Sequence, residues 1–175
     1  CHTRRQRQMC IRDSHGLGAL TVQEATANSG TADILSDGTL TATTINTQSA
    51  NLQASSGGIA ATTINATNGA TLLASAGDIN TGTLTSTGNV SIHAAGGNVI
   101  LGQVTASGET ATIYVQASGS ITEDSDATAD LDAGGLITLS AGSDLGTSSN
   151  RLDITAGDRL SATSTDGSIY LHGLG

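Results

Sequence analysis

The sequence predicts an all-β fold, a right-handed parallel β-helix (β-solenoid) with coils of about 20 residues. Two observations lead to this prediction. Aliphatic residues recur in register about every 20 positions, and within each unit apolar and polar residues alternate over short stretches, as is typical of half-buried strands. A third observation, a turn rich in glycine or asparagine after most of these stretches, indicates that the strands are short.

The register of the repeat is visible in three columns of aliphatic residues. The first column advances by 19, 20, 20 and 22 residues, the second by 19, 20 and 20, and the third by 20 each time. One coil cannot bury its own inward side chains, but coils stacked at a strand spacing of ~4.8 Å bury them against each other. In order, the columns are Leu40, Ile59, Ile79, Val99 and Ile121; Ile45, Ile64, Leu84 and Val104; and Leu52, Leu72 and Ile92.

Each unit is expected to consist of short strands joined by tight turns. The stretch 89–92 illustrates the alternation, and the small residues Ala54, Ala74 and Ala94 are expected to point into a narrow interior. No stretch has the spacing of an amphipathic helix. We expect positive φ angles at the turns, because glycine adopts them without a steric penalty. The turns are Gly57-Gly58, Asn68-Gly69, Gly77-Asp78 and Gly96-Gly97.

The later units are also periodic, and we expect them to be shorter than the earlier ones. In each of three triplets a polar residue stands between two apolar residues. This pattern predicts three matching strands, each with its outer residues pointing inward and its middle residue pointing outward. The triplets are Ile137–Leu139, Leu152–Ile154 and Ile169–Leu171.

An acidic run at residues 123–132 separates the earlier units from the later ones. We expect it to form a solvated loop that interrupts the stack of coils. A calcium site is the alternative, because this ion prefers several carboxylate oxygens, although the run has neither the EF-hand spacing nor a Gly-Gly-x-Gly-x-Asp repeat. The acidic residues are Glu123, Asp124, Asp126, Asp130 and Asp132.

Composition divides the chain into a basic head, residues 1–14, and an acidic body, residues 15–175. The body has no Cys, Met, Pro, Lys, Phe or Trp, and its two arginines, Arg151 and Arg159, stand against 14 acidic residues, a net charge of −12. So few basic residues exclude a nucleic-acid-binding surface. No apolar run approaches the ~20 residues of a membrane span.

The head, CHTRRQRQMCIRDS, has no hydrophobic periodicity and lacks the apolar core of a signal peptide. Residues 8–14 resemble the in-frame translation of the transposon end that is attached to DNA fragments in sequencing-library preparation. We therefore interpret residues 1–14 as an assembly artefact or a disordered head, with a genuine basic tail as the alternative. On the first interpretation, residues 15–175 are a β-helix repeat segment and a fragment of a larger protein.

Residues 16–175 resemble the repeat region of filamentous-haemagglutinin-like bacterial exoproteins. The segments 77–102 and 145–171 carry the resemblance, and the second segment, with Leu145–Asn150 followed by Leu152–Ile154 and Asp166–Leu171, is the more specific part. Members of this family are very large and form long right-handed β-helices. These shafts carry adhesive or toxic tips away from the cell, often after passage through an outer-membrane partner barrel.

The resemblance implies a non-catalytic structural shaft of a secreted or surface-attached bacterial adhesin, which supports cell adhesion. The implied partners are adjoining coils of the same chain, ligands on host or neighbouring cells, and an outer-membrane secretion partner. We expect no catalytic, cofactor-binding or metal-binding residues, and neither nucleic-acid binding nor a membrane span. A body without cysteine agrees with export in an unfolded state.

A β-helical carbohydrate-active enzyme, such as a polysaccharide hydrolase or lyase, is the first alternative function. Asp78, or Asp153 together with Arg151, would supply its carboxylate chemistry. The scarcity of basic residues and of aromatic residues that stack on sugar rings argues against it. His93 and His172 follow inward aliphatic residues, so both are expected to be isolated on the outer surface.

A threonine-rich ice-binding solenoid is the second alternative, because Thr81–Thr87 and Thr41–Thr43 place threonine at alternate positions. Such a surface needs the same Thr-x-Thr pair in every coil. The equivalent stretches read Ala61-Thr62-Thr63 and Gln103-Val104-Thr105, so the rank of threonines is broken. The preference of threonine for strands explains its abundance.

Overall fold

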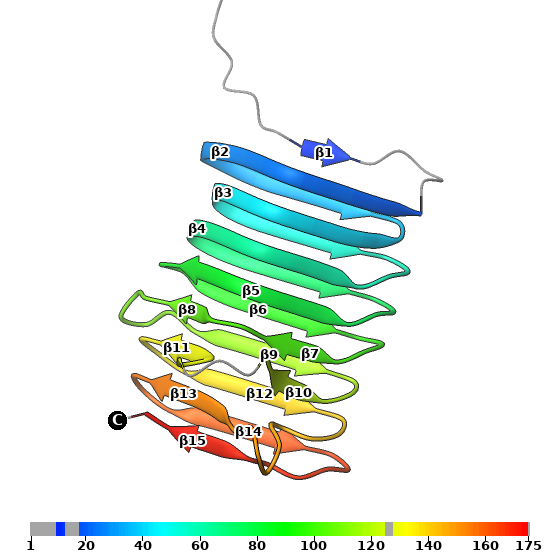
Figure 1. Cartoon of the computed structure of the whole chain (residues 1–175). Coiled ribbons are helices and arrows are strands. Elements are labelled where there is room, and N and C mark those ends of the chain that lie inside the picture. The colour runs from blue at the N-terminus through cyan, green and yellow to red at the C-terminus, as the bar shows by residue number, and fades with distance from the viewer. Residues whose placement is uncertain (1–9, 13–17, 125–127, 175) are drawn as a thin grey trace, which may run out of the picture.

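The computed structural model describes residues 10–12, 18–124 and 128–174 and confirms the all-β prediction. The strands form a parallel β-solenoid of about 8 turns, with coils about 20 residues apart and no helix among the described residues. Figure 1 shows the coils stacked from β2 at one end to β15 at the other, so that segments one coil apart in sequence lie side by side.

All strand pairings among the described residues are parallel, and they join the strands into one 15-stranded sheet. The strands are β1 (Cys10–Arg12), β2 (Ala19–Ser36), β3 (Thr39–Ala54), β4 (Ile59–Ala74), β5 (Ile79–Ser86), β6 (Asn89–Ala94), β7 (Val99–Leu101), β8 (Val104–Ala106), β9 (Ile113–Ala117), β10 (Ile121–Glu123), β11 (Leu131–Ala133), β12 (Ile137–Ala141), β13 (Leu152–Ala156), β14 (Leu160–Ser164) and β15 (Leu171–Gly173).

Strands are long in the first coils and shorter in the later ones. Each of β2, β3 and β4 continues from one face of the solenoid to the next, whereas later coils are divided by turns (Figure 1). As a result, β4 pairs with β5 through its first half, residues 59–66, and with β6 through its second half, residues 69–74. The alternation of the sequence fits this arrangement, since successive side chains point into and out of the wall.

The strand register confirms the three predicted columns. The first column extends beyond its predicted members, from Leu20 at one end to Leu145 and Ile169 at the other. Its members from Leu40 to Leu145 are at most 2% exposed and belong to one continuous hydrophobic core. Ala54, Ala74 and Ala94 stack in a further buried column, as expected from their size.

The later coils differ from the prediction in both length and register. Ile121, Leu145 and Ile169 follow one another at 24 residues, so these coils are longer than the earlier ones, not shorter. A turn takes up the additional residues, and it is closed by a 2.7 Å hydrogen bond from the Thr147 N–H to the Asn150 carbonyl. The three triplets also do not match one another: residues 137–139 pair with β9 and β14, whereas residues 152–154 pair with β15.

Close stacking, rather than a positive φ angle, explains most of the turn glycines. Among the described glycines only Gly69 (φ 152°) and Gly146 (φ 67°) have a positive φ, so the prediction is confirmed at Gly69 and wrong at the other turns. A Cβ atom on Gly77 would lie 2.5 Å from the backbone nitrogen of Gly58, one coil away. One on Gly97 would lie 2.6 Å from the Gly77 carbonyl carbon. Side chains here would therefore force the coils apart.

A ladder of polar side chains joins consecutive coils at one corner of the solenoid. At each step a side-chain oxygen accepts a hydrogen bond of 2.7–3.3 Å from the backbone N–H of the equivalent residue in the next coil. These bonds satisfy backbone donors at turns, where strand pairing is incomplete. The residues, in order, are Asp78, Asn98, Ser120, Asp144 and Ser168.

The structure describes three residues of the predicted head. Cys10–Arg12 form β1, which pairs in parallel with residues 33–35 of β2. The other residues of the segment 1–14, and most of the stretch interpreted as a translated transposon end, lie outside the described residues.

Candidate functional site

The first acidic residue of the 123–132 run points into the solenoid. Strand β10 ends at Glu123, which pairs with Leu101 and takes the inward position of that column. The side chain is inward because Ile121 is inward and side chains alternate along the strand, and Glu123 is only 9% exposed. The expectation that the run is a solvated loop is therefore wrong at this residue.

Asp130, near the other end of the run, is completely buried. Its backbone N–H donates to the Asp153 carbonyl at 2.9 Å, and its carbonyl accepts from the Val104 N–H at 2.8 Å. Its Oδ2 atom accepts a 2.7 Å hydrogen bond from the Asp153 N–H. Asp130 therefore belongs to the wall and links it to the coils on both sides, which corrects the expectation of a solvated loop here too.

The Glu123 and Asp130 carboxyl groups form a buried pair. Burial raises the pKa of Asp130 from an ordinary value of 3.8 to about 8; a hydrogen bond with Glu123 and the negative charges of Glu123 and Asp153 act in the same direction. The hydrogen bond from the Asp153 backbone opposes this rise in pKa. Two buried oxygens, Oε2 of Glu123 and Oδ1 of Asp130, receive no hydrogen bond from any N–H or hydroxyl donor.

The other described acids of the run face outward. Asp124 is exposed, and its N–H donates to the Leu101 carbonyl at 2.9 Å. Asp132 lies between Thr105 and Thr155 on the outer side of β11. Asp126 lies outside the described residues. Within the described ranges, no group of three or more His, Cys, Asp or Glu side chains is arranged to hold a metal ion.

A second pair of titratable residues lies on the outer surface. His172 on β15 is paired in register with Asp153 on β13, and its Nδ1 atom lies 2.8 Å from Asp153 Oδ1. The expectation that His172 is isolated is therefore wrong. In the part of the chain that the structure describes, Asp153 forms its ion pair with His172 and none with Arg151. Sequence reasoning missed this pair because the 19-residue coil that aligns the two residues is shorter than its neighbours.

The remaining residues considered for enzymatic chemistry lie apart from one another. Asp78 belongs to the corner ladder, where its Oδ1 atom accepts from Asn98. His93 lies between Leu73 and Gln116 on the outer side of β6. The structure therefore does not bring Asp78 and His93 together with Asp153 into one site.

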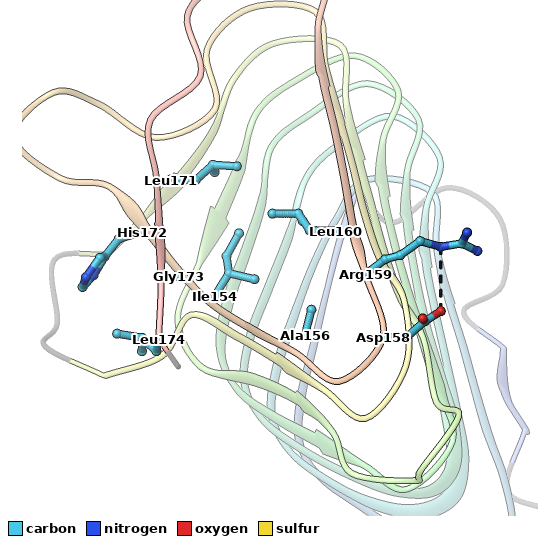
Figure 2. Close-up of a pocket in the computed structure, with 9 residues that line it drawn as sticks. All are labelled: Ile154, Ala156, Asp158, Arg159, Leu160, Leu171, His172, Gly173 and Leu174. Atoms are coloured by element: carbon cyan, nitrogen blue, oxygen red, sulfur yellow. Dashed lines mark ion pairs between the residues drawn. The ribbon is translucent and has the colours of Figure 1, made fainter.

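A hollow of about 390 Å³ lies at the last coil (Figure 2). Its inner surface is apolar, and Leu160, which continues an inward column beneath Ile137, is 40% exposed there. At its rim Arg159 lies 3.7 Å from Asp158, with both side chains largely exposed. The lining residues are Ile154, Ala156, Asp158, Arg159, Leu160, Leu171, His172, Gly173 and Leu174.

The register confirms that the rank of threonines is broken. Thr83 is aligned with Thr63, but two residues later Thr85 is aligned with Asn65, which donates a 2.9 Å hydrogen bond to Asn46. Thr81 is buried in an inward column. Repeated Thr-x-Thr pairs are therefore not formed along this face.

The sequence did contain a signal for the inward carboxylate. The 22-residue step from Val99 to Ile121 places Glu123 opposite Leu101, in a column that is otherwise apolar or threonine. Nothing comparable pointed to Asp130, because its burial depends on how the chain returns to the wall after Asp124. The carboxyl pair is the most unusual chemical feature of the described residues, yet its burial prevents direct contact with a large substrate.

Comparisons with protein-family models, with curated proteins and with solved structures find no match to this chain. No described helix is long and apolar enough to cross a membrane.

Proposed function

We propose that the chain is a structural, non-catalytic shaft segment of a large secreted or surface-attached bacterial adhesin, and that it supports cell adhesion. The observation that carries this proposal is the unbroken first column, which passes through every coil from Leu20 to Ile169. Each coil contacts mainly its neighbours, so additional coils lengthen the stack without changing its cross-section. Such a stack is suited to hold a binding module away from a cell.

The contacts between coils account for the stiffness that a shaft requires. Parallel backbone hydrogen bonds run along the stack, the buried columns fill its interior, and the corner ladder adds side-chain bonds between coils. The strongly acidic surface limits lateral association between shafts by charge repulsion. The function is therefore mechanical, and its residues are spread along the chain rather than gathered in one site.

The proposed partners follow from the same architecture. At the last coil Leu160 and Ile169 are 40% and 46% exposed, although their columns are buried in earlier coils. An adjoining coil of the same protein would cover them in the same register. Ligands on host or neighbouring cells and an outer-membrane secretion partner are proposed from the resemblance to filamentous-haemagglutinin-like exoproteins.

Long-read sequencing of the gene in its source DNA, through both ends of this reading frame, tests the proposal. We expect further units of 19–24 residues with the same columns, and an export segment upstream. A short frame that closes onto a carboxylate-rich coil would instead support a carbohydrate-active enzyme. It would also favour a genuine basic tail at residues 1–14.

An assay with the purified chain tests the non-catalytic part of the proposal directly. We expect no release of reducing ends or unsaturated products from acidic polysaccharides. Activity that is lost in Asp153→Asn, but not in Asp78→Asn, would contradict the proposal and assign the chemistry to the Asp153–His172 pair. A smooth thermal-hysteresis signal would instead point to an ice-binding surface.

A further inference from the structure

Glu123 and Asp130 are the buried acidic residues of the described chain, and each has one oxygen without a donor. Two ionised carboxylates in an apolar interior repel each other and lose their hydration, which is strongly unfavourable. A feature that neutralises one charge and connects the two unpartnered oxygens is therefore required. The remaining oxygen of Asp130, Oδ2, already accepts from the Asp153 N–H.

We propose that Glu123 and Asp130 form a proton-binding site in the wall of the solenoid, in which one shared proton ties β10 to the start of β11. A proton on Asp130 Oδ1 makes this atom a donor toward Glu123 Oε2, so both unpartnered oxygens gain a partner at once. The pair then carries a single negative charge. The hydrogen bond between the two side chains and the elevated pKa of Asp130 agree with this arrangement.

A bound metal ion explains the same two oxygens less well. Calcium takes about 6–8 oxygen ligands, and magnesium requires a nearly octahedral set. Among the described residues the pair is not part of a group of three or more acidic, His or Cys side chains that could hold a metal. A proton needs only the two oxygens that the structure provides.

The surrounding titratable groups leave Asp130 as the residue that holds the proton. Asp153 on β13 presents its backbone N–H to Asp130 Oδ2, and its own negative charge further disfavours ionisation of Asp130. Asp153 in turn contacts His172 on β15. Asp124 beside β10 and Asp132 on β11 face outward, and β7 and β8 contribute no titratable side chain to this part of the wall.

The shared proton makes the stability of the solenoid depend on pH. Unfolded Asp130 loses its proton near its ordinary pKa of 3.8, whereas the folded residue keeps it up to about pH 8. Between these values the folded state binds one more proton than the unfolded state, so stability falls as the pH rises. Above about pH 8 both states are ionised, and this dependence ends.

Thermal unfolding of the full chain, followed by circular dichroism between about pH 5 and pH 9, tests the proposal. We expect the midpoint temperature to fall by roughly 3–5 °C per pH unit up to about pH 8, and Asp130→Asn to remove most of this fall. The asparagine keeps an oxygen for the Asp153 N–H and offers an N–H to Glu123 at any pH. Asp132→Asn, an outward change on the same strand, is the control and should keep the slope. Equal slopes in all three proteins would overturn the proposal.

Infrared spectroscopy of the wild-type chain provides a second measurement that does not depend on how a variant folds. We expect the carbonyl band of a protonated carboxylic acid at neutral pH, and its loss above about pH 8. A neutral-pH spectrum without such a band would contradict the shared proton. A neutral-pH band that calcium titration abolishes would also overturn the proposal, because it would identify a cation as the natural occupant.

Discussion

The Oδ1 atom of Asp78 accepts two hydrogen bonds from Asn98, one from its backbone N–H at 2.7 Å and one from its side-chain Nδ2 at 3.2 Å. The two residues are equivalent positions in consecutive coils, each immediately before a member of the first column. Asn98 repeats the relationship toward Ser120, whose N–H it accepts at 2.8 Å. The corner is therefore bonded from coil to coil by side chains as well as by the backbone.

Substitution of Asp78 by alanine should destabilise the solenoid by about 1 kcal/mol, because the Asn98 N–H loses its side-chain acceptor. Asp78→Asn keeps an oxygen at the same position and should remain close to wild type, as Asn98 itself shows toward Ser120. Urea unfolding of the two variants measures the difference. Equal losses would indicate that the carboxylate charge, rather than the hydrogen bond, matters at this corner.

Substitution of Leu72 by alanine should lower the free energy of unfolding by about 2–5 kcal/mol, because Leu72 is fully buried between Leu52 and Ile92. Leu73, the next residue, points outward, so Leu73→Ala should cost far less. Chemical denaturation of both variants checks the direction of each side chain. A larger loss for Leu73→Ala would mean that the register of β4 is shifted by one residue.

Alanine at Gly77 should destabilise the fold by about 1–3 kcal/mol, since its Cβ atom would meet the backbone of Gly58 at 2.5 Å. Gly30→Ala is the control, because the nearest atom to its Cβ would be at an ordinary 3.9 Å. Differential scanning calorimetry compares the two. If Gly77→Ala melted at the same temperature as Gly30→Ala, close stacking would not be the reason for glycine at this turn.

The repeat architecture was predictable because its signal is redundant. The columns headed by Leu40, Ile45 and Leu52 recur in several coils, so an irregularity in one coil does not hide the period. The interior offers space for small and aliphatic residues only, and the sequence satisfies this in almost every coil. Periodicity therefore determined the fold class and the direction of most side chains in residues 39–106.

The candidate site was less predictable because it depends on local departures from the period. Glu123 was expected in solvent because of its charge, although its position in the alternation placed it inside. Asp130 and His172 acquire their neighbours through coils whose length changes near them. The turn glycines were misinterpreted for a different reason: the distance between stacked backbones is a property of the assembled solenoid and is absent from a single coil.

The central claim is that the chain is a stack of equivalent coils, and deletion of one whole coil tests it most directly. Removal of residues 79–98 brings Val99 to the position of Ile79, and Ser120 becomes the donor to Asp78. We expect this protein to keep its β-sheet circular dichroism spectrum and to melt cooperatively. Removal of residues 79–88, half a coil, joins mismatched faces and should abolish cooperative melting. If both deletions unfolded the chain equally, the coils would not be interchangeable, and the account of the protein as a shaft would be contradicted.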